Sequence, residues 1–225
     1  MNLFCTSILE KMSRGDENGL SNLVRSVPFL SNNKHIMMTL FIQTVAIILQ
    51  PVTTNLANNI LYHLAKDISI EFKNTKVTLF SSIEPHAEAQ FQLAFDKDRN
   101  QWDSLKLLEW LLEKFNPVKG TKMLAIFDID AFTSGFDFVF GEAYYRGRLA
   151  ATYISRLKQE FYGLKPNPSL FYERLVKEAI HELGHTFGFI HCKNSRCVMY
   201  FSTTLGDIDT KERSVCKKCN KKYFR

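Results

Sequence analysis

Apolar residues recur along the chain in short continuous runs that alternate with stretches of helical spacing. Runs of this length, bounded by Gly, Pro, Asn or charged residues, are typical of buried strands. They predict strands at Thr39–Gln50, which Pro51 would end, and at Lys76–Phe80, Lys122–Phe127, Phe136–Tyr145 and Leu149–Ile154.

Three segments instead show apolar residues three and four positions apart, as one face of a helix requires. The first extends from Leu56 to Ile68, with Thr53, Thr54 or Asn55 as candidate N-cap residues. The second runs from Leu105 to Phe115, where Asn116-Pro117 would end it. The third begins between Pro166 and Ser169, with Ser169 as a candidate cap, and continues to the histidines near residue 181.

The predicted order of elements is β-α-β-α-β-β-β-α. Strands joined through a helix are parallel, whereas the short link around Arg146-Gly147-Arg148 predicts an antiparallel pair. We therefore predict an α/β (α+β) fold with a mixed, mainly parallel twisted sheet. It should have one antiparallel edge strand, backing helices and a histidine-bearing helix packed against it.

The 225 residues are 45% hydrophobic, which suits one compact domain, in one or two lobes, with a sizeable core. Residues 1–35 differ, because they are polar and rich in Asn and Ser, and they predict an extension of weak order. The longest apolar run, Met37–Leu49, is too short to span a bilayer. The N-terminus also lacks the basic start of a signal peptide, so we expect a cytoplasmic protein without a membrane partner.

The net charge of +6 lies entirely in the last fifteen residues, where seven basic residues accompany one acidic residue. A basic tail can indicate nucleic-acid binding. The same tail contains Cys216 and Cys219, however, and four thiolates around one Zn²⁺ would carry a net charge of −2 that lysines offset. The tail also lacks the aromatic-plus-basic pattern of nucleic-acid-binding modules, so we do not expect a nucleic-acid partner.

The segment H-E-L-G-H-T-F-G-F-I-H at residues 181–191 has the spacing of a catalytic zinc site. His181 and His185 lie four apart, on one face of the predicted helix. Gly188 can take the left-handed conformation that ends a helix, which would let His191 return as a third ligand. Three neutral imidazoles leave a fourth zinc position for water. Glu182 points about 100° from His181, too far to ligate but well placed for that water.

A helix with two surface histidines is the plain alternative to a zinc site. At this composition H-E-x-x-H arises by chance in about one chain in a hundred. Requiring Gly188 and His191 as well lowers that probability to about one in a hundred thousand. The pattern therefore favours a catalytic zinc ion.

Four cysteines follow the histidines with the spacing of a structural zinc site. Cys192 and Cys197 are separated by four residues, and Cys216 and Cys219 by two. Cys192 directly follows His191, so its side chain would generally point away from the histidine-bound ion. Disulfides are the alternative, which the predicted cytoplasmic location disfavours. The segment after His191 has too little apolar content for a core of its own, and a Cys₄ zinc could fold it.

The long histidine motif followed by Met199 resembles that of the metzincin metalloproteases, in which a Met-turn follows the zinc ligands. The continuation H-C-x₄-C-V-M, with C-x-x-C further on, is similar to one branch of them, the archaemetzincins. The strand and helix order from about residue 39 fits the same family, whereas residues 1–35 have no counterpart that we recognise.

The resemblance implies a role for each residue of the motif. His181, His185 and His191 would bind the catalytic zinc, Glu182 would be the general base, and Met199 would form a hydrophobic floor beneath the ion. An ordinary core methionine is the alternative for Met199. Several metzincin branches have a tyrosine two residues after the methionine, where this chain has Phe201. Residues 36–191 would form the catalytic subdomain, and residues 192–225 a small zinc-stapled lobe with the Met-turn and the Cys₄ site.

The strand Phe136–Tyr145 matches in position the edge strand that metzincins use to bind substrate as an added antiparallel strand. Gly141 in this strand would permit close backbone approach or mark a bulge. Glu142 could contact substrate, although a solvated charge on the strand is the preferred interpretation.

These observations predict a monomeric zinc-dependent metallopeptidase that acts on peptides or proteins and holds two Zn²⁺ per chain, one catalytic and one structural. A catalytically weak, zinc-stabilised peptide-binding protein with the same fold is the alternative. The intact Glu182 argues against it, because zinc binding alone does not require that residue.

Overall fold

The computed structural model describes residues 45–54, 56–73 and 75–223. By its internal contacts the chain divides into two units, Met1–Phe41 and Ile42–Arg225. The first unit lies outside the described residues. So do the predicted N-terminal extension at residues 1–35 and the start of the predicted strand Thr39–Gln50.

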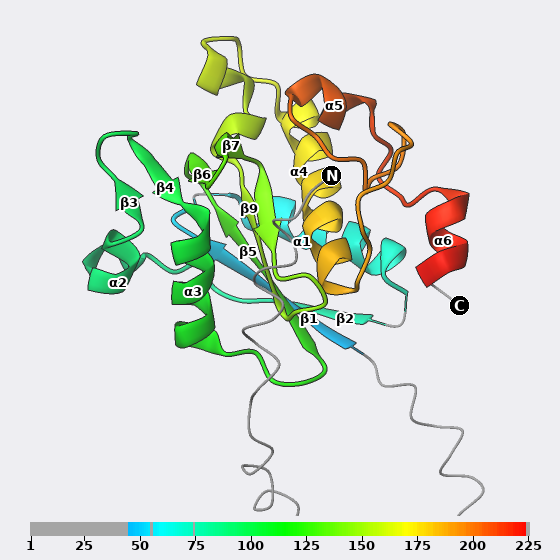
Figure 1. The fold of residues 1–225 in the computed structure, drawn as a ribbon, viewed down its shortest axis with the longest axis horizontal. Helices are drawn as coiled ribbons and strands as arrows, with labels where there is room; N and C mark the ends of the chain where they lie inside the picture. Colours follow the sequence, from blue (N-terminus) through cyan, green and yellow to red (C-terminus); the bar gives the residue numbers. More distant parts are fainter. Residues whose placement is uncertain (1–44, 55, 74, 224–225) are drawn as a thin grey trace, which may run out of the picture. The chain divides into compact units, whose positions relative to one another are not determined.

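A five-stranded sheet with the order β2-β1-β5-β9-β8 forms the centre of the second unit (Figure 1). Its strands are β1 (Val45–Val52), β2 (Thr75–Leu79), β5 (Thr121–Phe127), β8 (Gly141–Ala143) and β9 (Leu149–Tyr153). The first four strands in that order pair in parallel, and β8 pairs antiparallel with β9 at the edge. The predicted fold class is thereby confirmed.

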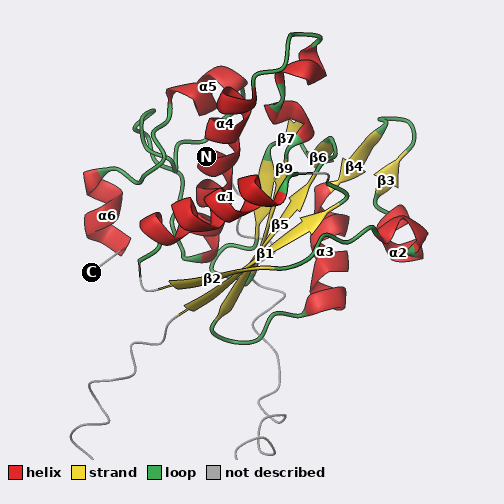
Figure 2. Ribbon diagram, turned by 180° about the vertical axis from the view of Figure 1, so that it is seen from behind, coloured by secondary structure: helices red, strands yellow, loops and turns green. Residues whose placement is uncertain are grey.

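Helices cover both faces of this sheet. Helices α1 (Asn58–Glu71) and α4 (Pro168–Thr186) pack on one face, and α3 (Ser104–Phe115) packs on the other (Figure 2). Successive residues of β5 alternate between the two cores, with Leu124 and Ile126 on the α1–α4 side and Ala125 on the α3 side. Because both faces are buried from Met123 to Phe127, this part of the strand is apolar throughout, as its sequence indicated.

The prediction that Pro51 ends the first strand is wrong, because β1 continues to Val52. Pro51 lies opposite Ile126 of β5, and its carbonyl accepts a hydrogen bond from Ile83 N at 3.1 Å. The proline nitrogen therefore faces the side of β1 on which β2 has already ended. The missing N–H breaks no ladder hydrogen bond at this position, so the proline is tolerated inside the strand.

A smaller sheet that the sequence pattern did not predict has the order β3-β4-β6-β7. Its strands are β3 (Phe95–Asp96), β4 (Gln101–Asp103), β6 (Ala131–Thr133) and β7 (Phe136–Val139). Short helical turns precede it at η2 (Pro85–Ala87) and α2 (Ala89–Gln92). The predicted single strand Phe136–Tyr145 is therefore wrong. Its first half, β7, pairs with β6, and its second half is β8 of the large sheet.

Helix caps differ from two of the predictions. The Asn167 side chain caps α4 by accepting a hydrogen bond from Leu170 N at 3.0 Å, so the predicted cap Ser169 is wrong. Pro168 occupies the first helical position, where its missing N–H costs nothing. Helix α1 begins after Ala57 without a side-chain cap, which excludes the predicted Thr53 and Thr54; Asn55 is outside the described residues. Helix α3 ends at Phe115, directly before the predicted Asn116-Pro117, and Asn116 takes the left-handed conformation.

The chain beyond α4 returns alongside that helix (Figure 1, orange and red). The remaining elements are η3 (Ser155–Leu157) and η4 (Gln159–Tyr162) before α4, and α5 (Leu205–Thr210) and α6 (Lys217–Tyr223) after it. Buried Arg174 of α4 donates two hydrogen bonds to the Asp209 carboxylate, both at 2.7 Å. Among the described residues, no helix combines the length and apolarity that crossing a bilayer requires. The division into subdomains at residue 191 stays a prediction.

Asn167→Ala should lower the free energy of unfolding by about 1 kcal/mol, because it leaves the Leu170 N–H without its cap. Thermal unfolding should shift down by roughly 2–4 °C. Ser169→Ala, two positions away and exposed, is the matched control and should leave the melting temperature unchanged. The opposite ranking would mean that Ser169 caps the helix.

Candidate active site and metal centres

Helix α4 brings the histidines of the sequence motif together. The His181 and His185 rings lie 4.7 Å apart, and their Nε2 atoms are separated by 3.1 Å. The helix ends at Thr186, and Gly188 has a φ of 93°, so the chain reverses there. The His191 ring consequently lies 5.4 Å from His181 and 4.8 Å from His185. One nitrogen from each histidine falls within 4.8 Å of the others, and the three could hold a metal ion.

The protons of two of these rings are fixed by backbone carbonyls. His181 Nδ1 donates to Val198 O at 2.8 Å, and His185 Nδ1 donates to Phe189 O at 2.9 Å. A carbonyl oxygen only accepts, so each Nδ1 carries the proton and each Nε2 keeps a lone pair. Burial lowers the pKa of all three histidines, that of His191 to about 4, which favours the neutral form.

This arrangement fits a zinc ion. Without a proton between them, two lone pairs at 3.1 Å repel each other, and a cation would remove that repulsion. Tetrahedral zinc with nitrogen ligands at about 2.0–2.1 Å places neighbouring ligand atoms about 3.3 Å apart. Carbonyl acceptors on the second ring nitrogen are also the usual partners of zinc-bound histidine.

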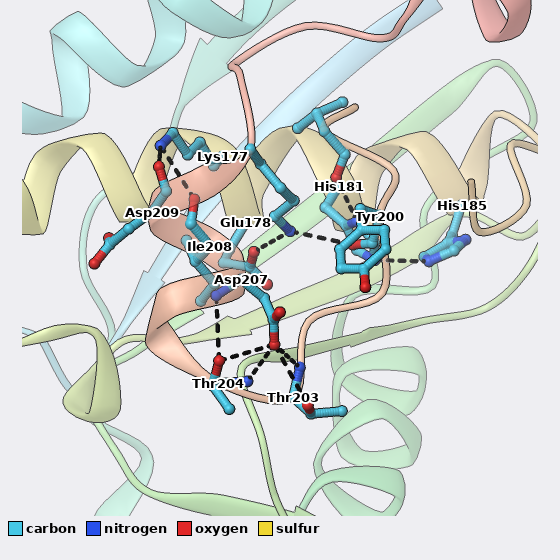
Figure 3. A network of polar contacts seen from close by, with 12 residues as sticks. Lys177, Glu178, His181, His185, Tyr200, Thr203, Thr204, Asp207, Ile208 and Asp209 are labelled. Atoms are coloured by element: carbon cyan, nitrogen blue, oxygen red, sulfur yellow. Dashed lines mark hydrogen bonds and ion pairs between the residues drawn. The ribbon is translucent and has the colours of Figure 1, made fainter. Parts of the chain in front are cut away.

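A buried ion pair lies close to His181, and Figure 3 shows its Glu178 member on the same helix. Lys211 Nζ donates to Glu178 Oε1 at 2.6 Å and to Tyr200 O at 3.4 Å. The two side chains are 0% and 4% exposed. Glu178 belongs to α4, whereas Tyr200 follows Met199, so one ammonium group joins the histidine helix to the predicted Met-turn. Near this pair, Thr204 and Asp207 form a reciprocal cap that begins α5.

Met199 is fully buried and packs against α4 at Gly184. A Cβ atom at residue 184 would lie 2.6 Å from the Met199 sulfur, so the methionine occupies the space that this glycine leaves. The predicted role of Met199 beneath a zinc ion stays a prediction. Phe201, which stands where several metzincins have a tyrosine, has its ring 4.8 Å from His191 and offers no ligand atom.

Glu182 is 5% exposed beside these histidines. Burial raises the pKa of its carboxyl group well above the usual value, and the nearby Glu178 and Glu142 carboxylates raise it further. Lys211 acts in the opposite direction. The Glu182 carboxyl group therefore holds a proton more readily than an exposed glutamate does.

The prediction that Glu142 is a solvated strand charge is wrong. Its carboxylate accepts a hydrogen bond from the Ser104 hydroxyl group and another from Thr133, and burial raises its pKa. Gly141 before it pairs regularly with Thr152, so it does not mark a bulge.

Two segments bring the four cysteines of the C-terminal region together. All four sulfur atoms lie within 4.8 Å of one another, with Cys192 3.9 Å from Cys216 and Cys197 4.0 Å from Cys219. All four are free thiols, as these separations require. Tetrahedral zinc with sulfur ligands at about 2.3 Å would separate the sulfur atoms by about 3.8 Å, so this cluster also fits zinc.

Backbone hydrogen bonds support this cluster. Cys216 N donates to Cys197 Sγ at 3.2 Å, and Cys192 N donates to Met199 O at 2.8 Å. Burial raises the pKa of the Cys216 thiol, but hydrogen bonds from Cys219 and the other cysteines outweigh burial and bring it to about 7. A thiol with a lowered pKa is ready to ligate as thiolate.

Glu178, Lys211 and Ser104 were not predicted from the sequence. Glu178 had a local signal, because it lies four residues before Glu182 on the same helix. Lys211 had none, since its partner is 33 residues away and its charge was counted with the basic tail.

The fold, the three histidines and the buried glutamate beside them are those of a metallopeptidase. The sequence model of peptidase family M54 matches residues 86–225 of this chain. The chain therefore belongs to peptidase family M54, and the predicted enzyme class, a zinc metallopeptidase, is confirmed.

Named relatives agree with this assignment and with the predicted resemblance. The archaemetzincin of Methanocaldococcus jannaschii is 43% identical over 129 residues, which cover 57% of this chain and 69% of the relative. The archaemetzincin structure from Archaeoglobus fulgidus superposes with a TM-score of 0.64 at 30% identity, covering 79% of this chain and 99% of that one. A zinc-dependent peptidase from Methanocorpusculum labreanum gives a TM-score of 0.68 at 28% identity, covering 78% and 99% of the two chains.

Lys211→Met should lower the free energy of unfolding by about 3–5 kcal/mol, because it leaves the Glu178 carboxylate buried without its partner. Adding Glu178→Leu should recover much of that loss, since the pair is then replaced by apolar side chains. Denaturant unfolding of the zinc-loaded protein measures both effects. Lys165→Met, at an exposed lysine away from the cysteine cluster, is the control. Equal losses from Lys211→Met and Lys165→Met would contradict the importance of this pair.

Proposed function

We propose that this protein hydrolyses peptide bonds at a zinc ion held by His181, His185 and His191, with Glu182 as general base, and that a second zinc ion is held by the four cysteines. One observation carries the proposal. The His181 and His185 Nε2 atoms face each other at 3.1 Å while carbonyl groups hold their protons on Nδ1, and the buried Glu182 carboxyl group lies on the same helix.

When bound, zinc supplies a Lewis acid that polarises the scissile carbonyl group and lowers the pKa of water to about 7. Glu182 takes a proton from the attacking water and later delivers it to the leaving amine. Its raised pKa suits both steps, because a carboxyl group of ordinary pKa would be a poor acid at neutral pH. The Val198 and Phe189 carbonyl groups hold the two helix imidazoles in the ligating tautomer.

The substrate would add to the edge of the large sheet at β8. Tyr153 N donates to Phe140 O and Tyr144 N donates to Leu149 O, so the even-numbered residues near β8 bond to β9. The peptide groups of Gly141 and Ala143 then face the other side, where β8 has no paired strand among the described residues. An extended peptide could pair there, close to Glu182.

The cysteine site would be structural. It joins the segment at Cys192–Cys197 to that at Cys216–Cys219, and both flank the chain that carries Val198 and Met199. Four thiolates around Zn²⁺ leave a net charge of −2, and the neighbouring exposed Lys217 and Lys218 would offset it. Such a site can supply most of the folding free energy of a segment with a small core.

Glu182→Gln should reduce the rate of peptide hydrolysis by about 100-fold or more, because the amide keeps the shape of the side chain but accepts no proton. Zinc content should not change. Turnover of a peptide library followed by mass spectrometry measures the loss, with exposed Glu113→Gln on α3 as control. If the mutant cleaves like the wild type, Glu182 is not the base. If neither protein cleaves although both bind zinc and peptides, the chain is a peptide-binding protein.

Cys216→Ser should remove one zinc equivalent of two and destabilise the C-terminal segment more than the histidine site. The physical reason is that thiolate ligation folds this segment, with zinc contributing on the order of 10 kcal/mol in small zinc folds. Limited proteolysis should cut the mutant first after about residue 200, while the preceding elements stay protected. Ser214→Ala, exposed and two residues away, should behave like the wild type. A Cys216→Ser protein with both ions and wild-type resistance would exclude a structural cysteine site.

A further inference from the structure

Gly141 of β8 lies directly against the side chain of Glu182. A Cβ atom built on Gly141 would lie 2.4 Å from Cγ, 2.6 Å from Oε1 and 2.7 Å from Cδ of that glutamate. Cβ atoms do not approach other heavy atoms within 3.0 Å in real structures. The glutamate side chain therefore occupies the space that any other residue at position 141 would need.

The conformation of Gly141 does not explain why a glycine is present. Its φ is not among the positive values that other glycines of the chain adopt, such as 93° at Gly188. It pairs with Thr152 in ordinary antiparallel register. Alanine could adopt this backbone conformation, so the constraint at this position is one of space alone.

Both sides of this contact are held in place. Strand β8 is hydrogen-bonded to β9, and the next residue, Glu142, is anchored by the Ser104 hydroxyl group. Helix α4 is joined to the end of this strand by a hydrogen bond from Arg146 N to His185 O at 2.9 Å. The strand and the helix cannot move apart here without breaking that bond. A methyl group on residue 141 would therefore displace the Glu182 side chain itself.

We infer that Gly141 is a positioning residue for the reaction: its missing side chain forms the slot that holds the Glu182 carboxyl group beside the histidines. The inference rests on the proposed role of Glu182 as general base. The Glu182 carboxyl group reaches the attacking water from this slot, and a displacement of about 1 Å at such a group can lower a rate about 100-fold.

At two other glycines a built Cβ atom would meet a weaker obstacle than at Gly141. At Gly184 the nearest obstacle is the end of the Met199 side chain, which has several rotatable bonds and can move. At Gly206 of α5 the nearest atom, Thr204 Oγ1, is 3.6 Å from a built Cβ, an ordinary contact. Gly206→Ala therefore serves as the matched control for the chemical change from glycine to alanine.

The first experiment is a thermal unfolding cycle on the zinc-loaded full chain with wild type, Gly141→Ala, Glu182→Ala and the double mutant. Gly141→Ala should lower the melting temperature by about 5 °C through overpacking. In the Glu182→Ala background, Gly141→Ala should not lower the melting temperature measurably, because the Cγ, Cδ and Oε1 atoms of residue 182 are then absent. Zinc content should stay the same in all four proteins, and Gly206→Ala should not lower the melting temperature.

The second experiment separates positioning from packing by peptide hydrolysis. Gly141→Ala should lower kcat by roughly 10- to 100-fold with KM within about twofold of wild type, because the peptide groups of β8 keep their places. In the Glu182→Gln background the glycine substitution should not lower the residual rate further. A wild-type kcat for Gly141→Ala would overturn the inference. A drop in melting temperature on Gly141→Ala that persists in the Glu182→Ala background would overturn it as well.

Failure of the inference and failure of the proposed function have different signatures. If Glu182→Gln cleaves like wild type, the proposed function is wrong whatever the melting temperatures show. If Glu182→Gln is inactive but Gly141→Ala keeps its kcat, the function stands and the positioning role is wrong. Should Gly141→Ala alone fail to fold, folding of the double mutant with Glu182→Ala would still support the slot, and failure of both would contradict it.

Discussion

The hydrogen bond from His181 Nδ1 to Val198 O is the constraint on which the rest of the site depends. A neutral imidazole has one ring N–H. Because the His181 N–H is at Nδ1 and bonds to the carbonyl group, the free lone pair of this ring is on Nε2 and faces the site. The same bond fixes the chain that follows the histidine motif against α4. Val198 lies between Cys197 and Met199, so the register of this one contact also places the cysteine cluster and the buried methionine.

The buried pair of Lys211 and Glu178 holds the same two parts of the chain together at a second point. Its ammonium group bonds to the helix through Glu178 and to the carbonyl group of Tyr200. About 100° round α4 from His181, the edge strand β8 approaches closely enough that only glycine fits against Glu182. The helix therefore contacts a strand that receives the carboxyl group and a segment that orients the His181 imidazole. The candidate histidine site and the proposed base depend on these two contacts.

Some features were predictable because their signals are local. His181, His185 and Gly188 act through helical spacing and a helix end, and the cysteine spacings indicated a second cluster, so the sequence predicted which residues the structure brings together. The fold class followed from the alternation of strand and helix patterns. The break within Phe136–Tyr145 was not predictable, because an alternating pattern looks the same whether a strand continues or changes its partner.

The remaining features depend on contacts between distant residues. Nothing in the sequence near Lys211 indicates that its charge is buried, because Glu178 lies 33 residues earlier. The same holds for Gly141, whose neighbour Glu182 belongs to another element. Strand β1 can continue through Pro51 because β2 has already ended, and the sequence of β1 does not indicate where β2 ends.

X-ray absorption at the zinc edge tests the central claim most directly, namely that one chain holds two chemically different zinc sites. The zinc-loaded wild type should show sulfur scatterers at about 2.3 Å together with nitrogen or oxygen scatterers at about 2.0–2.1 Å. A folded chain with Cys192, Cys197, Cys216 and Cys219 replaced by serine should retain only the nitrogen and oxygen shell. A wild-type spectrum with a single kind of ligand, all sulfur or all nitrogen and oxygen, at two zinc ions per chain would contradict it.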